Sequence, residues 1–155
     1  MPLKPPSYVL KQFDQINTLD IYQILKLRSA VFVSEQNCAY LDLDDIDQQA
    51  LHLFQKSDDN HIIAYARILP PALSNGQFTS IGRVVVAQSH RQLKLGRALM
   101  EAAIDQAQNL YPDHPIKISA QTYLTRFYQS LGFINTGVYY LEDDIPHQEM
   151  VYQTN

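Results

Sequence analysis

Apolar residues recur at helical spacing in two long stretches of the chain. In the first, positions three and four apart are Ile21, Ile24, Leu25, Arg28, Val31 and Phe32. This spacing predicts a helix over residues 19–33, with Asn17 and Thr18 as candidate capping residues. In the second, one face carries Leu95, Leu99, Ala103, Ala107 and Leu110. It predicts a helix over residues 93–110, ended by Pro112.

Segments rich in β-branched and aromatic residues predict the strands. Residues 50–56, 61–69 and 78–87 are separated by turn-forming sequences, a tight turn at 57–60 and a longer one containing Pro70, Pro71, Asn75 and Gly76. They predict an antiparallel meander. Further strands are expected at 8–13, 116–120, 133–140 and 147–153. Residues 37–47, rich in Asp and Asn, suit an ordered loop or a short second helix.

A third helix is predicted after residue 120. Thr122 is its candidate cap, and Leu124, Phe127, Tyr128 and Leu131 share one face. Gly132 can end it with a positive φ. The resulting order, β-α-β-β-β-α-β-α-β-β, predicts a mixed α+β fold in one domain over residues 1–155. Its strand-helix-strand crossover over 84–120 requires local parallel pairing.

Composition narrows the choice of function. The chain has 46% hydrophobic and 18% charged residues and a formal net charge of -4. It has no apolar run long enough to span a membrane and no N-terminal segment typical of a secretory signal, so we expect a soluble, cytoplasmic protein without a membrane partner. The net charge argues against nucleic acid as a partner. Cys38 is the single cysteine and lacks a recognisable His partner, which favours an inert thiol.

Acidic residues gather in two segments: Asp42, Asp44, Asp45 and Asp47, and then Glu142, Asp143 and Asp144. Two solvated loops are the simpler interpretation. The alternative is that these residues attract a cationic, amine-bearing substrate.

The segment over 82–99 predicts a phosphate site. A β-branched strand runs through a polar loop into a helix whose first turn contains Gly96, with Arg91, Lys94 and Arg97 nearby. Free N–H groups at a helix N-terminus bind anions, and cations there would add charge-assisted bonds. A surface loop with solubilising charges is the alternative.

Two motifs carry a resemblance to a known family. Residues 91–96 resemble motif A of the GNAT acetyltransferases, a pyrophosphate-binding loop, with Arg91, Lys94 and Gly96 at its fixed positions. Lys94 stands where most members have glycine. Residues 120–133 resemble motif B, which ends in the pattern F-Y-x-x-x-G-F. Residues 28–40, 42–47, 65–69 and 145–150 are similar to the ElaA-type branch of this superfamily.

The resemblance implies a mixed, splayed sheet of six to seven strands flanked by helices, with a cleft for the pantetheine arm of acetyl-coenzyme A (acetyl-CoA). The backbone of Val84 and Val86 would bind the pantetheine amides, and the amides of residues 92–97 would hold the pyrophosphate. The implied cofactor-binding residues are Val84, Val85, Val86, Arg91, Gln92, Leu93, Lys94, Leu95, Gly96, Arg97, Gln121 and Tyr128. We expect no metal.

The resemblance also implies catalytic roles for individual residues. It implies that Tyr128 assists the departing thiolate. Judged from the residue pattern alone, Tyr128 would be an aromatic residue at the edge of the core. An amine must lose a proton before it attacks, so a base is needed, and Glu35 and His147 are the candidates. His52 and Arg67 could line the acceptor side, or pair with carboxylates and hold the sheet together.

The expected function is transfer of an acetyl group from acetyl-CoA to an amine-bearing small molecule or peptide. One alternative is a non-catalytic module that binds or senses acyl-CoA, and another is a nucleotide-phosphate binder of a different fold. Terminal strands in such folds often pair across dimers, so a homodimer is a further expectation.

Overall fold

Seven strands form one mixed sheet in residues 7–153, the part of the chain that the computed structural model describes. The strands are β1 (Val9–Gln12), β2 (Leu51–Lys56), β3 (Ile62–Leu69), β4 (Thr79–Val86), β5 (Ile116–Gln121), β6 (Ile134–Glu142) and β7 (Ile145–Tyr152). Their order in space is β1-β2-β3-β4-β5-β7-β6. The predicted α+β class is therefore confirmed. The prediction of one domain over 1–155 extends beyond the described residues.

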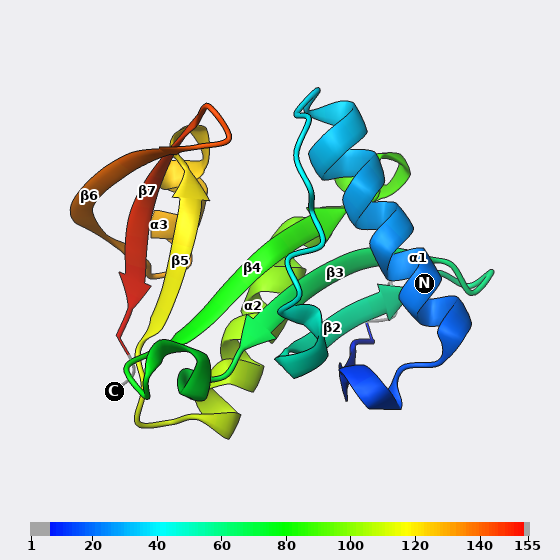
Figure 1. Cartoon of the computed structure of the whole chain (residues 1–155), viewed down its shortest axis with the longest axis horizontal. Coiled ribbons are helices and arrows are strands. Elements are labelled where there is room, and N and C mark those ends of the chain that lie inside the picture. Colours follow the sequence, from blue (N-terminus) through cyan, green and yellow to red (C-terminus); the bar gives the residue numbers. More distant parts are fainter. Residues whose placement is uncertain (1–6, 154–155) are drawn as a thin grey trace.

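The sheet splays open between β4 and β5. These strands are parallel, as the crossover requires, but they pair only at Thr79 with Ile116 and at Ser80 with Lys117. Beyond these pairs the two strands diverge (Figure 1). Every other pair of neighbouring strands is antiparallel, including the predicted meander β2-β3-β4. The splay leaves one edge of β4 and one edge of β5 without a strand partner.

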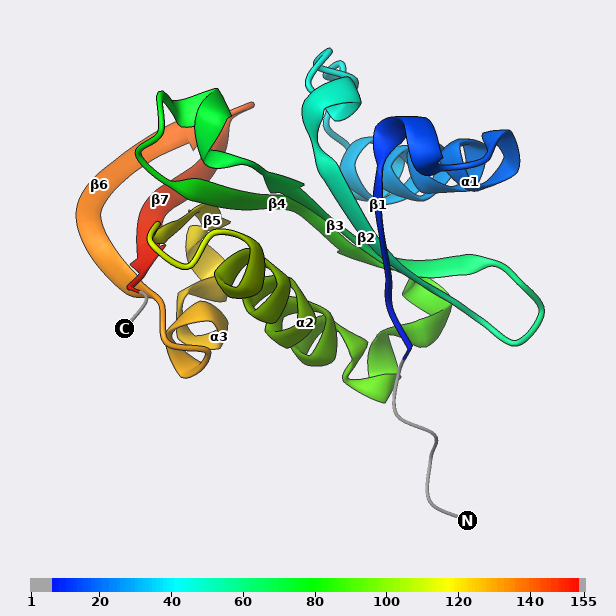
Figure 2. The ribbon, with the colours of Figure 1, turned by 90° about the horizontal axis from the view of Figure 1, so that it is seen from below.

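Helix α1 (Thr18–Arg28) covers one face of the sheet (Figure 2). The Asn17 side chain caps it by accepting a hydrogen bond from the backbone N–H of Asp20 at 2.8 Å, whereas Thr18 is the first helical residue. The predicted helix continues as a π-helical segment, Ser29–Glu35. A second core, including Ile24, packs beneath α1 against the inner side chains of β2, β3 and β4.

Helix α2 (Leu95–Leu110) packs on the opposite face of the sheet. Its apolar side packs as predicted at four positions: Leu95, Leu99, Ala103 and Ala107 are buried. Leu110, the last residue of the helix, is exposed. The helix also begins later than predicted. Residues Gln88–Leu93 form 3₁₀ turns, and Lys94 takes a left-handed conformation (φ 55°) that breaks the helical path.

Helix α3 (Thr125–Ser130) ends as predicted, with Gly132 at φ 105°. The N–H of Phe133 donates to the carbonyl of Tyr128, and the N–H of Gly132 donates to that of Gln129, which is a Schellman motif. The prediction that Thr122 caps this helix was wrong. Thr122 starts a 3₁₀ turn before α3, because the chain leaves β5 in a tighter turn.

Residues 37–47 are an ordered loop and not a second helix. The chain there is irregular up to a short 3₁₀ turn, Asp47–Gln49. Within residues 7–153, no helix has the length and apolar character needed to cross a membrane.

Candidate active site

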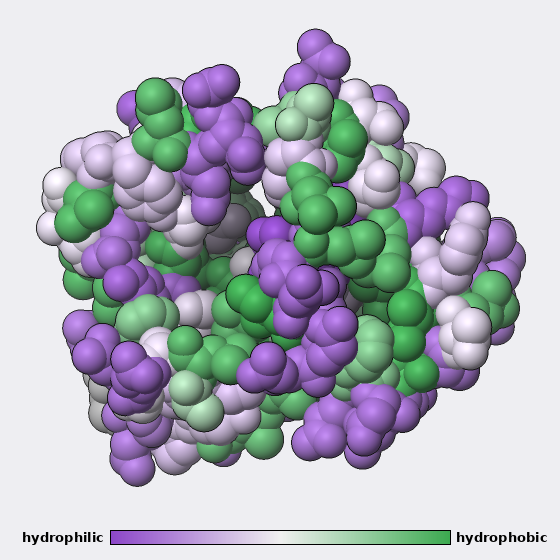
Figure 3. All heavy atoms as spheres, in the orientation of Figure 1, coloured by the Kyte–Doolittle hydropathy of each residue, from purple (hydrophilic) through white to green (hydrophobic). Residues whose placement is uncertain are grey.

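A cavity of about 560 Å³ occupies the gap between the diverging strands. Its walls come from β4, β5, the π-helical segment and its following loop, the start of α3, and the β6–β7 turn. Figure 3 shows a hollow in this face of the molecule, with hydrophilic residues along its rim. The predicted site residues that line it are Glu35, Val84, Val85, Val86, Arg91, Gln121, Tyr128 and His147. Folding thus brings together residues from six separate elements of the chain.

The predicted phosphate-binding loop lies beside the cavity. Gln92, Leu93, Lys94, Leu95, Gly96 and Arg97 do not line the cavity, and they lead from the 3₁₀ turns into α2. A Cβ atom built on Gly96 would meet nothing within 4 Å, so the space in front of this first turn is open. Lys94 holds the left-handed conformation that a glycine adopts without strain. The backbone therefore keeps a glycine-like path despite the lysine.

Tyr128 projects from α3 into the cavity. Its side chain is buried, and Phe127 and Phe133 pack edge-on against its ring. Burial raises the pKa of Tyr128 to about 12, so the phenol stays protonated near neutral pH. Within residues 7–153 its hydroxyl makes no hydrogen bond in the structure. It is therefore available to a ligand in the cavity.

His147 lies on β7 at the opposite wall, and its ring is 8% exposed. Its Nδ1 lies 2.7 Å from the carbonyl oxygen of Ile145, and its Nε2 lies 3.3 Å from a carboxylate oxygen of Glu142. Because the carbonyl oxygen can only accept, Nδ1–H donates to Ile145, which leaves Nε2, beside the Glu142 carboxylate, as the nitrogen that can take up a proton. Tyr140 stacks on the ring, with centroids 6.0 Å apart. His147 and Glu142 can therefore hold a proton between them at the cavity wall.

Glu35, the other candidate base, is paired with Arg91. Both guanidinium Nη atoms donate to the two carboxylate oxygens, one of them at 2.7 Å. This hydrogen bonding from Arg91 lowers the pKa of Glu35, which weakens it as a base. Arg91 also donates to the carbonyl of Val86 at 3.3 Å. Glu35 thus fixes the first residue of the phosphate motif.

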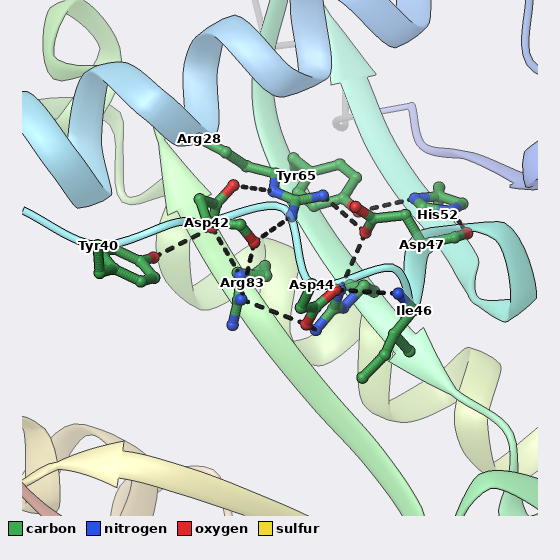
Figure 4. Close-up of polar contacts among 10 residues, drawn as sticks. Arg28, Tyr40, Asp42, Asp44, Ile46, Asp47, His52, Tyr65 and Arg83 are labelled. Atoms are coloured by element: carbon green, nitrogen blue, oxygen red, sulfur yellow. Dashed lines mark hydrogen bonds and ion pairs between the residues drawn. The ribbon is translucent and has the colours of Figure 1, made fainter. Parts of the chain in front are cut away.

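The first acidic segment is neither a solvated loop nor a substrate attractor. Asp42 and Asp47 are buried, and both accept from the fully buried Arg28 at 2.8 Å (Figure 4). Asp44 accepts two bonds of 2.8 Å from Arg67. Asp42, Asp44 and Asp47 are therefore paired internally and fix the loop to α1 and β3, whereas Asp45 is exposed.

This buried network also decides between the interpretations of His52 and Arg67. Neither lines the cavity. Arg67 pairs with Asp44 and Asp47, and His52 lies 2.8 Å from the carbonyl oxygen of Asp47 and 2.7 Å from the Tyr65 hydroxyl. Burial lowers the pKa of His52, which suits a neutral ring that donates to Asp47 and accepts from Tyr65. Both residues hold the sheet to the loop.

The second acidic segment behaves differently. Glu142 and Asp143 line the cavity from the β6–β7 turn, and Asp144 follows them in that turn. Cys38 also lines the cavity, and its sulfur lies 3.8 Å from the carbonyl oxygen of Asp143. This contact brings the two walls together at one end of the cavity. No cluster of three or more His, Cys, Asp and Glu side chains suited to a metal ion occurs in residues 7–153.

Several cavity-lining residues were not among the predicted site residues, and two of them are polar side chains that contact Asp42. Arg83 lies in β4 beside the predicted Val84, and Tyr40 lies in the loop after the π-helical segment. The Tyr40 hydroxyl donates to Asp42 at 3.1 Å, and burial together with Asp42 raises the pKa of Tyr40 to about 12. Val84, the next residue, had been assigned to the site, but no local pattern marks Arg83 itself.

Comparisons with known proteins give the family and the fold. The family model described as an acetyltransferase (GNAT) domain matches residues 29–154. The protein ElaA of Escherichia coli K12 is 39% identical over 135 residues, which cover 86% of this chain and 87% of ElaA. Its crystal structure matches with a TM-score of 0.87 at 36% identity, over 95% of this chain and 99% of that one.

A second solved structure is similar over the same length. It is described as an acyl-CoA N-acyltransferase from Pseudomonas aeruginosa, and it matches with a TM-score of 0.89 at 38% identity. The match covers 96% of this chain and 99% of that one. The splayed seven-stranded sheet, the family model and these relatives agree, and the chain belongs to the GNAT acetyltransferase family, where it is similar to the ElaA proteins.

Proposed function

We propose that this protein is an N-acetyltransferase that moves an acetyl group from acetyl-CoA to an amine. The observation that carries the proposal is the hydroxyl of Tyr128, a buried residue that lines the cavity between two diverging strands and whose hydroxyl has no hydrogen-bond partner within residues 7–153. A donor in that position can act on a ligand held between the strands. Its role rests on this placement and on its match to motif B.

The cofactor side of the cavity suits a thioester with an extended arm and a diphosphate. Backbone groups of Val84 and Val86 lie where β4 has parted from β5, so an amide-containing arm can bind there as an added strand. The first turn of α2 offers free N–H groups, and Gly96 leaves space before them. Arg91 supplies charge between these two regions.

The first requirement of the reaction is a group that stabilises the leaving thiolate. The amine nitrogen attacks the thioester carbonyl carbon, the C–S bond breaks, and the electron pair leaves on sulfur. A phenol with a pKa of about 12 lies roughly 3 to 4 units above a typical thiol. Full proton transfer from Tyr128 is therefore uphill, and a hydrogen bond that stabilises the thiolate is the favoured contribution.

The proton released by the amine needs an acceptor. We assign this role to His147 with Glu142, because the pair lines the cavity and can share a proton. Glu35 is occupied by Arg91 and is better suited to holding that side chain in place. Asp143, exposed at the same wall, adds negative charge that favours a cationic acceptor. A homodimer and a cytoplasmic location stay predictions.

The direct test is turnover. Purified protein is incubated with acetyl-CoA and a panel of polyamines, amino sugars and lysine peptides, while thiol release is followed. Acceptor-dependent release supports the proposal. Binding of acetyl-CoA with no release for any acceptor would favour the non-catalytic binding or sensing module.

Tyr128→Phe tests the thiolate contact. The variant removes one hydroxyl and leaves the ring packing intact, so coenzyme A affinity should stay within about twofold while kcat falls roughly 10 to 1000-fold. His147→Gln is the matched variant at the other wall, and it should lower kcat because it removes the proposed proton acceptor and leaves the thiolate contact in place. Full turnover by Tyr128→Phe would remove this residue from the mechanism.

Gly96→Trp tests the phosphate loop. A tryptophan side chain would fill the open space before α2 and should abolish coenzyme A binding in calorimetry. Gly96→Ala is the control, because its single methyl group meets no protein atom within 4 Å and should weaken binding much less. Undiminished affinity of the Trp variant would contradict this placement.

A further inference from the structure

Arg83 occupies a bulge in β4. The register pairs Gly82 with Arg67 and Val85 with Tyr65, so two residues of β4 lie opposite one residue of β3. Arg83 is left-handed here, with a φ of 50°. A non-glycine side chain disfavours this conformation, and bulges re-aim the backbone of the strand that carries them. Contacts made by the Arg83 side chain must therefore offset the cost of this backbone conformation.

The Arg83 side chain is held by the loop over residues 37–47, called the aspartate loop below, which carries Asp42 and Asp44 (Figure 4). The guanidinium Nε of Arg83 lies 2.7 Å from a carboxylate oxygen of Asp42, and an Nη atom donates to the Asp42 carbonyl at 3.0 Å. The same Nη lies 3.4 Å from Asp44. Asp42 is fixed by buried Arg28, and Asp44 is fixed by Arg67. The Arg83 side chain is thus tied to a loop that is itself anchored to α1 and β3.

The bulge lies where the shape of β4 matters for a ligand. Pairing between β4 and β5 ends at Ser80, and all residues over 82–86 line the cavity. The free edge of β4 in this stretch offers backbone N–H and C=O groups to the cavity. The conformation of residue 83 decides how those groups are aimed.

From this geometry we infer that Arg83 is a positioning residue, held by Asp42 and Asp44 so that the bulged edge of β4 binds the extended amide arm of the thioester substrate. The inference rests on the proposed function in one respect, the identity of that arm. Arg83 acts through the backbone conformation that it maintains. Its guanidinium points toward the loop carboxylates and need not touch the ligand.

Two substitutions distinguish an effect of the backbone conformation at residue 83 from a direct effect of the Arg83 side chain. Arg83→Ala removes the contacts with Asp42 and Asp44 and keeps a Cβ atom, which disfavours a positive φ. Arg83→Gly also removes the hold, but glycine populates positive φ freely. Neither change strands a buried charge, because Asp42 keeps Arg28 and Asp44 keeps Arg67. Thermal unfolding checks that both variants are folded, and Arg83→Gln replaces the Ala variant in the comparison if that variant does not fold.

The readout is binding of two ligands by calorimetry. Coenzyme A contains the arm, and 3′-phosphoadenosine 5′-diphosphate contains the phosphates without it. The ratio of the two Kd values therefore isolates the contribution of the arm. We expect Arg83→Ala to weaken coenzyme A binding about tenfold, with the nucleotide affinity changed less than about twofold, and Arg83→Gly to restore most of the loss.

Other outcomes would overturn the inference. Equal losses in the Ala and Gly variants would mean that the side chain itself acts on the ligand. Parallel losses for both ligands would place Arg83 at the phosphates, and unchanged binding in both variants would leave it no role. Failure of the unaltered protein to bind coenzyme A would instead refute the proposed function, which keeps the two ideas distinguishable.

Discussion

Replacing Arg28 with methionine should cost about 3 kcal/mol of unfolding free energy. Arg28 is fully buried and donates to both Asp42 and Asp47. Removing one member of a buried ion pair costs about 3 to 5 kcal/mol, because the other charge is left without compensation. Here Asp42 keeps Arg83 and Asp47 keeps Arg67, and methionine retains most of the apolar volume. These compensations place the expected loss at the lower end of that range.

The measurement is urea unfolding followed by circular dichroism, with the m value checked for constancy. Arg97→Met is the matched control, since Arg97 forms an exposed i,i+4 pair with Glu101. Such pairs contribute little, so this variant should lose less than about 0.5 kcal/mol. A loss below about 1 kcal/mol for Arg28→Met, or one equal to that of the control, would refute the claim that Arg28 compensates buried carboxylates.

Two further predictions concern stability. Gly132→Ala should lower the unfolding free energy by about 2 to 3 kcal/mol in urea unfolding, because φ is 105° and the new Cβ would lie 2.8 Å from the Tyr152 ring. Gly137→Ala, at φ 88° in open space, is the control. Equal losses in the two variants would exclude the ring contact as a cause. Hydrogen bonds from Arg67 lower the pKa of Asp44 to about 2, below its value near 4 in the unfolded chain. The ionised Asp44 therefore contributes about 1 to 2 kcal/mol to the unfolding free energy above pH 4, and this contribution is lost as pH falls toward 2. Asp44→Asn should show a shallower decline in unfolding free energy between pH 5 and 3, and an unchanged slope would contradict this.

Periodicity was a good guide to elements that bury one face. The spacing of Leu95, Leu99 and Ala103 identified the buried side of α2 from the sequence alone. The first helical pattern even included Arg28 among its apolar positions, and Arg28 is buried there. Helix starts were harder to predict. The break at Lys94 comes from a backbone conformation that lysine does not favour, and only the surrounding fold maintains it.

The aspartate loop could not be understood from local sequence. A run of acidic residues resembles a solvated segment when its partners are unknown, and the arginines that bind Asp42 lie 14 and 41 positions away. The bulge at Arg83 was hidden for a related reason, because it depends on the register between β3 and β4. By contrast, Tyr128, Arg91 and the strand at Val84 were predicted through short motifs, and they meet in one cavity.

The charges around the cavity explain why the proposed chemistry suits this site. Among the cavity-lining residues that the structure describes, Glu35 pairs with Arg91 and Arg83 pairs with Asp42, whereas Asp143 is exposed at the wall and adds negative charge that can attract an ammonium ion. A thioester carbonyl is neutral, and an amine must also be neutral when it attacks. The wall can thus attract an amine in its charged form, but attack on the thioester requires loss of the amine's proton within the cavity. In the proposed mechanism His147 takes up that proton, and the nearby Glu142 carboxylate would stabilise the resulting imidazolium.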